Sequence, residues 1–419
     1  MTGNWSGPVT RRAALAAALG VGATVFSGGS SRAAKARATF EQWVASFRAR
    51  ARARGISDAT YSSVMEHIKP DTAVYEQQRF QPEFREPLWK YLNRRVSAWR
   101  VEFGRKKARD AAALFDRIEA RYGVDRFTLA GIWGNESAFG ELVTDRRYMR
   151  PVIPALAALA YGEPRRRAYW EQELLNALTI VQRGWAAPED MIGSWAGAMG
   201  HTQWMPEVWL RIGVDFDHDG RISPFGSPGD ALAGTARYLV ERGKYRRGEG
   251  WGGEVRLPPS LAGSQGEGRT LTIGQWKDIG VTSASGDALA GDAVRARLWV
   301  PARNGPAFLL CQNFHAVKSY NPSSSYALAV TLLADRLRGR PPLSRLFPGG
   351  ERALTLSEME ELQTRLTRLR YDTFHRDGRV GRETIAAVAD FQRKQDFPRP
   401  DGYPGLEVLA RLRQVTGAN

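Results

Sequence analysis

Cysteine is almost absent from this chain, which has one thiol, Cys311, in 419 residues. A single cysteine excludes an internal disulfide, and its distance from the N-terminus excludes a lipidated cysteine directly after an export signal. It follows the apolar residues 308–310, so core packing is its expected role. Long hydrophobic runs are lacking too, because the apolar stretch 13–26 is too short to span a bilayer. We therefore expect a soluble protein without a membrane anchor.

Acidic residues are few relative to basic ones. The chain has 44 Asp and Glu against 60 Lys and Arg, which gives a formal charge of +16 at pH 7. The excess of bases persists when the residues before Glu41 are set aside, and it favours an anionic polymer or surface as partner. No nucleic-acid-binding motif accompanies the charge, so nucleic acid is not the expected partner. The 43% of hydrophobic residues suits about two folded domains with ample core.

The first residues, 1–38, have the pattern of an export signal. Thr10 and the pair Arg11-Arg12 precede an Ala/Gly/Val-rich run, and small residues follow up to Ala-Lys-Ala at 34–36 or Ala-Arg-Ala at 36–38. Paired arginines before a mildly hydrophobic run resemble a bacterial twin-arginine signal. A basic disordered tail is the alternative. The export interpretation places the mature protein, starting near Arg37 or Thr39, outside the cytoplasm.

One acid stands alone among apolar residues near the middle of the chain. Residues 131–140 read GIWGNESAFG, in which Glu136 is the only charged residue and has Trp133 and Phe139 as neighbours. A carboxyl group held against aromatic surface is desolvated, which favours its protonated form and suits it to act as a general acid. The alternative is the end of an amphipathic helix, with Glu136 facing water.

Helical patterns dominate residues 40–250, and short β-like runs follow them. Asp125 can cap a helix that carries Glu136 at its C-terminal end, and a long helix is expected to begin near Pro164. Four runs separated by Gly, Ser and Pro predict a small sheet inserted into a helical domain, at residues 254–257, 270–273, 297–300 and 307–310. Helical character returns at 325–337. The expected fold class is therefore mainly α, of the α+β kind.

A segment rich in Pro and Gly, residues 341–352, predicts a linker between a domain over 39–340 and a smaller one over 353–417. The smaller unit contains about three helical patterns, at 356–366, 384–391 and 406–412. A unit of this size is a natural binding module. A C-terminal domain that serves only stability is the alternative.

Further motifs follow Glu136 in a recognisable order. Residues 193–200 read GSWAGAMG and lead into QWMP at 203–206, and their small side chains let backbone approach a ligand closely. NFH at 313–315 and YNP at 320–322 come later. With GNESAFG before them, these motifs closely resemble the lytic murein transglycosylase B family over about residues 40–338.

The C-terminal unit has its own resemblance. DGRVG at 377–381, followed by Thr384, resembles the three-helix peptidoglycan-binding module. The chain departs from the pattern at Arg370-Tyr371, where many members have Gly after the first helix, so the wall-binding surface can differ there. A basic module on a short linker would raise the concentration of the catalytic site on its polymer.

The resemblance to the transglycosylases implies a lysozyme-like helical fold that cleaves the β-1,4 bond between N-acetylmuramic acid and N-acetylglucosamine without consuming water. Most glycosidases pair the acid with a second carboxylate. No motif supplies one here, since Glu141 and Asp145 have polar flanks. Glu136 would protonate the leaving oxygen and then accept the proton of the muramic C6 hydroxyl, closing a 1,6-anhydro ring. A lysozyme-like muramidase and a non-catalytic wall-binding scaffold are the alternatives.

The resemblance also implies substrate-binding residues. Ser194 and Gln203 would hydrogen-bond the substrate near the acid, and Tyr320, Asn321 and Tyr326 would form an aromatic and amide wall. Tyr238 would contact a sugar, and Arg165, Arg166 and Tyr169 would bind peptide and sugar. Tyr91 matches a substrate-binding position of the family less closely. The forked guanidinium suits the carboxylates of a stem peptide. Half-buried core is the alternative for each tyrosine, and a solvated helix start for the arginines. The implied partners are glycan strands and stem peptides, for a periplasmic monomer that needs no catalytic cofactor.

Residues 215–223, DFDHDGRIS, copy the first half of an EF-hand loop, with oxygens at alternate positions and Gly220 at the sixth. The expected ligands are Asp215, Asp217, Asp219 and Arg221. The loop then departs from the motif, because its twelfth residue is Gly226, and the later acid Asp230 could replace the missing Glu. We expect a structural calcium or sodium ion, with an empty Asp-rich turn as the alternative.

Overall fold

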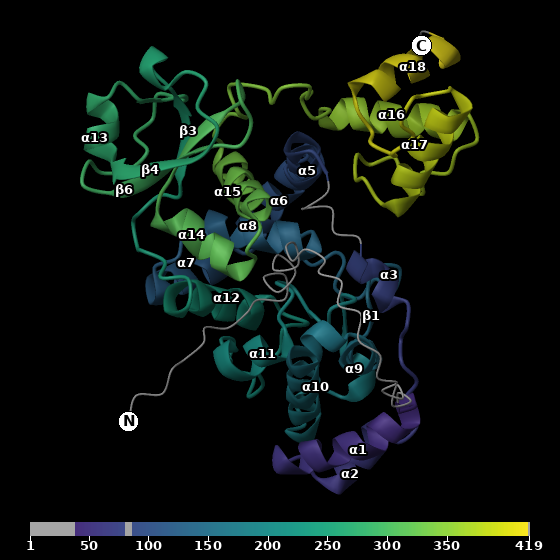
Figure 1. Cartoon of the computed structure of the whole chain (residues 1–419). Coiled ribbons are helices and arrows are strands. Elements are labelled where there is room, and N and C mark those ends of the chain that lie inside the picture. The colour runs from purple at the N-terminus through teal and green to yellow at the C-terminus, as the bar shows by residue number, and fades with distance from the viewer. Residues whose placement is uncertain (1–37, 80–85, 418–419) are drawn as a thin grey trace, which may run out of the picture. The chain divides into compact units, whose positions relative to one another are not determined.

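The structure is a computed structural model that describes residues 38–79 and 86–417 (Figure 1). The predicted export signal lies outside the described residues, apart from Ala38. Helices greatly outnumber strands, which confirms the mainly α class. Within the described part of the chain, no helix is both long enough and apolar enough to cross a membrane.

The chain divides into two compact units, and each is built from two separate segments. Unit 1 combines Met1–Gln81 with Gly140–Thr235, and unit 2 combines Pro82–Phe139 with Ala236–Asn419. The elements of unit 1 are α1 (Phe40–Ala53), α2 (Asp58–Met65), α3 (Val74–Arg79), β1 (Arg150–Pro151), α9 (Val152–Gly162), α10 (Arg167–Gln182), β2 (Ile192–Gly193), α11 (Pro206–Ile212) and the start of α12 (Gly229–Glu241).

The core of unit 1 surrounds α9. This helix is apolar on all sides, VIPALAALAYG, and nearly all of it is buried, as expected for a helix enclosed by others. Helix α10 packs against it and contributes the buried Trp170. Trp204, from the loop before α11, is buried in the same cluster. The predicted long helix thus begins at Arg167, after a 3-10 turn over Pro164–Arg166.

The helices of unit 2 that precede the sheet form one packed group with the two that follow it. They are α5 (Leu88–Arg95), α6 (Ala98–Asp110), α7 (Ala112–Tyr122), α8 (Arg126–Ser137), α14 (Gln312–Tyr320) and α15 (Ser324–Arg338). Helix α8 packs closely on α15, because a Cβ added at Gly131 would lie 2.6 Å from the carbonyl oxygen of Val330. The Asp125 side chain accepts a hydrogen bond from the Thr128 N–H, which confirms the predicted N-cap of α8.

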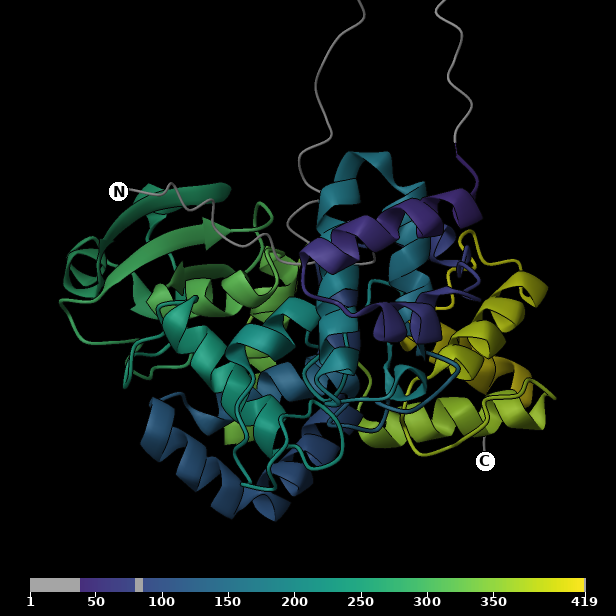
Figure 2. The same cartoon turned by 90° about the horizontal axis from the view of Figure 1, so that it is seen from below.

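The predicted inserted sheet is present and has five antiparallel strands (Figure 2). Their order is β4-β6-β7-β3-β5, and they comprise β3 (Gly252–Arg256), β4 (Gly266–Thr272), β5 (Thr282–Ser283), β6 (Arg295–Val300) and β7 (Ala307–Leu310). The short α13 (Ile273–Asp278) follows β4 and buries Trp276 against the sheet. Cys311 is buried in the same cluster, as the sequence predicted.

The C-terminal module is a bundle of three helices, drawn in yellow-green to yellow in Figures 1 and 2. They are α16 (Leu356–Arg368), α17 (Arg382–Lys394) and α18 (Leu406–Thr416), which confirms the three predicted helical patterns. Leu362, Phe391 and Leu412 meet in its core. The buried Gln363 accepts from the Gly378 N–H (2.9 Å) and donates to the Arg379 carbonyl (2.8 Å), so it fixes the DGRVG turn.

Candidate active site

Glu136 lies in the last turn of α8, where the sequence placed it. Its neighbours in the sequence are buried: Trp133 is 4% exposed and Phe139 is 1% exposed, whereas Glu136 is half-buried. The carboxylate therefore stands at the edge of an apolar environment with access from outside. That combination suits a group that exchanges protons with a bound substrate.

The backbone directly after Glu136 adopts an uncommon conformation. Ala138 (φ +52°) and Phe139 (φ +60°) are both left-handed, although neither is glycine. Their N–H groups donate to Gly134 O (3.2 Å) and Trp133 O (3.3 Å), which closes the helix. Conformations of this kind cost of order 1–3 kcal/mol and persist where the surroundings enforce them. The turn that presents Glu136 is thus set by packing rather than by local preference.

The Phe139 ring supplies that packing. It fills a notch between α6 and α8 that exists because Gly104 and Gly134 lack side chains. A Cβ on Gly104 would lie 2.3 Å from the ring carbon Cζ, and one on Gly134 would lie 2.5 Å from the same atom. Two glycines on different helices therefore hold one aromatic ring, and the ring holds the turn.

Two arginines that sequence reasoning missed bind the end of α8. Arg100 Nε donates to Gly134 O (3.3 Å), and Arg95 Nη1 donates to Asn135 O (3.2 Å). The one available signal was Arg100 itself, a charged residue beside the buried positions Val101 and Gly104 of α6. Its contact with α8 is tertiary and has no local signature.

Ser194 and Gln203, predicted as substrate-binding residues, lie on one loop of unit 1. Ser194 Oγ accepts from the Ala198 N–H (3.2 Å), and Gln203 Nε2 donates to Gly200 O (3.0 Å). Gln203 is 6% exposed and left-handed (φ +56°). One of the small residues of this loop permits a close approach to another segment, because a Cβ on Gly200 would lie 2.1 Å from the carbonyl oxygen of Pro224, which follows α11.

The predicted aromatic and amide residues Tyr238, Tyr320, Asn321 and Tyr326 all belong to unit 2. Tyr238 and Tyr320 meet edge to face at 5.1 Å, and Tyr238 OH donates to Ser319 O (3.0 Å). Asn321 and Tyr326 are each 2% exposed. The Asn321 Nδ2 group is buried without a hydrogen-bond partner among the described residues, which leaves a donor available to a ligand.

Tyr91 lies on α5 and is 2% exposed. The guanidinium of Arg95 stands 5.5 Å from the centre of its ring. The structure thus places Tyr91, the weaker match, beside a residue that binds the end of α8. Its burial fits the core role that the sequence left open for each tyrosine.

Arg165, Arg166 and Tyr169 surround the start of α10 in unit 1. Arg165 is exposed, whereas Arg166 stands 4.6 Å from the ring centres of both Tyr169 and Trp170. All three guanidinium nitrogens of Arg166 are buried and lack a hydrogen-bond partner within the described ranges. Burial lowers the pKa of Arg166. A buried guanidinium without an acceptor is well suited to bind an anionic group.

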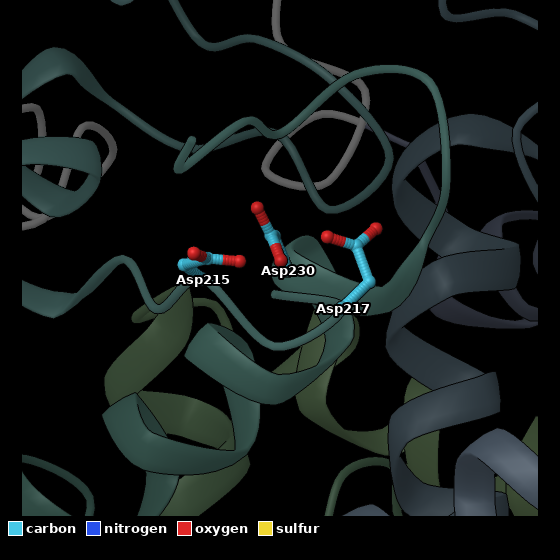
Figure 3. Close-up of side chains that lie close together, drawn as sticks. All are labelled: Asp215, Asp217 and Asp230. Carbon is cyan, nitrogen blue, oxygen red and sulfur yellow. The ribbon is translucent and has the colours of Figure 1, made fainter. Parts of the chain in front are cut away.

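Three predicted metal ligands converge, as Figure 3 shows. Asp215, Asp217 and Asp230 each place a carboxylate oxygen within 4.8 Å of the others. Asp230 is 4% exposed and accepts from Phe216 N (2.7 Å) and Ser223 N (2.9 Å), and burial, followed by the two neighbouring carboxylates, raises its pKa.

Asp215 Oδ1 is buried with no hydrogen-bond partner among described residues. An orphaned carboxylate oxygen beside two further acids is a donor set that suits a hard cation. Asp219 is not part of the cluster and instead accepts from the Arg221 N–H (2.8 Å).

Two parts of the chain match known protein families. Residues 39–335 match the Transglycosylase SLT domain family, and residues 355–412 match the peptidoglycan binding domain family. Membrane-bound lytic murein transglycosylase B of Escherichia coli (strain K12) is 30% identical over 216 residues, which cover 50% of this chain and 56% of that protein. The chain thus spans little more than half the length of this curated relative.

Solved structures agree with the sequence matches. SltB3 from Pseudomonas aeruginosa in complex with NAG-anhNAM-pentapeptide is 40% identical, with a TM-score of 0.68, over 90% of this chain and 99% of that one. SltB3 in complex with NAG-NAM-pentapeptide is 41% identical, with a TM-score of 0.69, over 90% of this chain and 100% of that chain. Escherichia coli Slt35 in complex with calcium shares the fold at 24% identity, with a TM-score of 0.60. The match covers 71% of this chain and 92% of the Slt35 chain. The chain therefore belongs to the Transglycosylase SLT domain family and ends in a peptidoglycan-binding domain.

Proposed function

We propose that this protein is a lytic transglycosylase that cleaves the β-1,4 bond between N-acetylmuramic acid and N-acetylglucosamine in peptidoglycan. The observation that carries the proposal is Glu136, which is half-buried at the end of α8 and is flanked in the sequence by the buried Trp133 and Phe139. Family membership supports it, as does the likeness to SltB3, which was solved with a sugar that contains an anhydro ring.

One carboxylic acid suffices for this reaction. Protonated Glu136 gives its proton to the glycosidic oxygen, and the departing N-acetylglucosamine end takes the bonding electrons. The substrate's own N-acetyl group stabilises the cationic carbon. Glu136, now a carboxylate, accepts the proton of the muramic C6 hydroxyl, whose oxygen bonds to that carbon and closes the 1,6-anhydro ring. This second transfer leaves Glu136 protonated again, and no water is consumed. Asp145, an acid close to Glu136 in the sequence, is ion-paired with Arg147.

Digestion of purified murein followed by mass spectrometry tests the reaction. Anhydro ends are one water lighter than reducing ends, so reducing ends alone would favour the muramidase. Glu136→Gln should lower turnover by roughly 10²–10⁴-fold, the usual contribution of a general acid. Glu141→Gln, which removes an exposed acid close in sequence, is the matched control. Binding without cleavage by the unsubstituted protein would favour the scaffold.

Arg166 is proposed to bind a carboxylate of the stem peptide. Its buried guanidinium, which has no hydrogen-bond acceptor among the described residues, supports this role, and pentapeptide is present in both SltB3 complexes. Arg166→Gln should raise KM for peptide-bearing strands and leave cleavage of peptide-free glycan unchanged. Arg167→Gln, an exposed neighbour, is the control. Equal effects of Arg166→Gln on both substrates would rule the role out, as would equal cleavage of naked and intact strands by the unsubstituted enzyme.

Asp215, Asp217 and Asp230 are proposed to hold a structural calcium ion. Asp215 Oδ1, which is buried and has no hydrogen-bond donor within the described part of the chain, supports this, and the Slt35 structure was solved in complex with calcium. Calcium, but not sodium at the same ionic strength, should raise Tm, and Asp215→Asn should abolish the rise. Asp278→Asn, outside the cluster, is the control. Because bound calcium requires ionised carboxylates and the pKa of Asp230 is raised, the rise should diminish as the pH falls. An equal rise with sodium would assign the site to a different ion.

The place of action is proposed to be the periplasm. The export signal predicted at residues 1–38 supports this location, as does a substrate that lies outside the cytoplasm. The C-terminal module, residues 353–417, is proposed to bind the same polymer. Fractionation of cells that produce the full chain tests the location, and retention in the cytoplasm would contradict it.

A further inference from the structure

The end of α8 is held by arginines from two earlier helices of unit 2, α5 and α6. The last carbonyls of a helix lack intrahelical donors, and a cation there also complements the helix dipole. Arg100, on α6, donates through Nε to Gly134 O (3.3 Å) and through Nη1 to Arg94 O (3.0 Å). One guanidinium therefore ties the end of α5 to the turn that contains Glu136.

Arg95 adds a second tie, from α5 itself, to Asn135 O, the carbonyl directly before Glu136. Burial, followed by the like charges of Arg95 and Arg379, lowers the pKa of Arg100 to about 9, so Arg100 still keeps its proton at neutral pH. Both Arg95 and Arg100 donate to backbone carbonyls. Such bonds fix backbone position, which is the requirement of a residue that presents an acid to substrate.

The C-terminal module reaches the same two helices. Arg379, in its DGRVG turn, lies 5.3 Å from the ring centre of Trp99 on α6. Trp99 stacks on Phe103 at 4.7 Å, and Phe103 contacts Phe139 at 6.1 Å. An aromatic chain therefore runs from the module to the ring that holds the turn after Glu136.

The module and the segment before it also contact α5. Asn93 Nδ2 donates to Tyr403 OH (2.9 Å) and to the Glu351 carbonyl (2.9 Å), and Lys90 pairs with Asp401. The Trp89 ring meets that of Tyr403 edge to face at 5.3 Å. The module thus contacts α5 and α6, the two helices that carry Arg95 and Arg100.

We propose that Arg95 and Arg100 are positioning residues for Glu136, and that the module, through Arg379 and its contacts with α5, sets the position of the helices that carry them. The module then contributes to turnover as well as to attachment to the wall. This inference rests on the proposed role of Glu136 as the catalytic acid.

The first experiment compares two arginines of α6 in the full chain. Arg100→Met removes the ties to Gly134 and Arg94, whereas the control Arg105→Met removes a similar bond, 2.8 Å long, to the Arg336 carbonyl of α15. We expect Arg100→Met to lower kcat by roughly tenfold to a hundredfold with little change in KM, since a misplacement of about 1 Å can cost 10²-fold. Arg105→Met should lower Tm and leave kcat of the folded enzyme unchanged.

The second experiment tests the module with a soluble murein tetrasaccharide, on which attachment to the wall cannot matter. Arg379→Ala should lower kcat several-fold on this fragment, while the control Arg376→Ala, an exposed arginine of the same module, should not. Restoration of kcat by Arg379→Lys, which keeps the cation over Trp99, would support the contact.

The outcomes separate the inference from the function on which it rests. If Glu136→Gln is inactive while folded Arg100→Met retains kcat within a factor of about two, the positioning role is refuted and the catalytic role stands. If Arg100→Met does not fold, Arg95→Met applies the same test. If Arg379→Ala weakens only the digestion of intact murein, the module serves attachment alone. If Glu136→Gln remains active, the proposed function itself fails.

Discussion

Gly134→Ala should destabilise this protein, although alanine normally favours a helix. Gly134 lies inside α8, two residues before Glu136. In an unobstructed helix, the change from Gly to Ala gains about 1 kcal/mol. Here the new Cβ would lie 2.5 Å from Phe139 Cζ and 2.9 Å from Leu333 Cδ2, whereas ordinary contact begins at 3.4 Å. The ring or the helix has to move.

The size of the effect follows from that overlap. Restoring normal contact requires a shift of roughly 1 Å, and overpacking of a core typically costs about 1–3 kcal/mol. After subtraction of the helical gain, we expect a net loss of about 0–2 kcal/mol in the free energy of unfolding. The same shift at the turn that carries Glu136 should lower kcat by up to about 10²-fold.

Urea unfolding and product formation on murein, measured on the same preparations, test both expectations. Gly274→Ala on α13 is the control, because its Cβ would approach no atom closer than 3.4 Å. Combining Gly134→Ala with Phe139→Leu should show a coupling of about 0.5–3 kcal/mol, since the smaller side chain relieves the clash. A gain of about 1 kcal/mol for Gly134→Ala alone, with kcat intact, would refute the notch as the origin of the turn.

Three shorter predictions concern other regions. Hydrogen bonding from Arg413 lowers the pKa of Glu361 to about 2, below its ordinary 4.5. The stability that ionised Glu361 contributes is therefore complete above pH 4.5 and is lost as the pH falls toward 2. Glu361→Gln should flatten the acid limb of a circular dichroism titration of the full chain. Burial raises the pKa of Cys311 to about 12, and this fully buried thiol should react with iodoacetamide only after unfolding. Gly200→Ala combines a left-handed φ of +72° with a 2.1 Å approach to Pro224 O, and it should lower the unfolding free energy by at least about 2 kcal/mol in urea.

Local patterns predicted the elements that carry the candidate site. The Asp125 cap located the start of α8, and the position of Glu136 near its end followed from helix length. The run at 307–310 coincides with β7, because its apolar residues need burial on both faces. Such features depend on neighbours within a few residues, so the sequence contains them directly.

The geometry around Glu136 depends on residues far apart in the chain. Nothing near Phe139 predicts a left-handed turn, because the notch that enforces it is half made by Gly104 on another helix. Arg100 reads as a surface residue until α6 is placed against α8. The strand order β4-β6-β7-β3-β5 has the same origin, since registers between distant strands leave no local mark.

The interleaving of the two units also governs the order in which the chain can fold during synthesis. Unit 1 cannot be completed until Thr235 has emerged, because its second segment begins only after Phe139. Helix α8 leaves the ribosome long before α15, whose Val330 carbonyl covers Gly131. At about 5–20 residues per second, its apolar face stays exposed for roughly 10–40 s. The nascent chain therefore spends that interval with the segment around Glu136 open to aggregation and in need of protection.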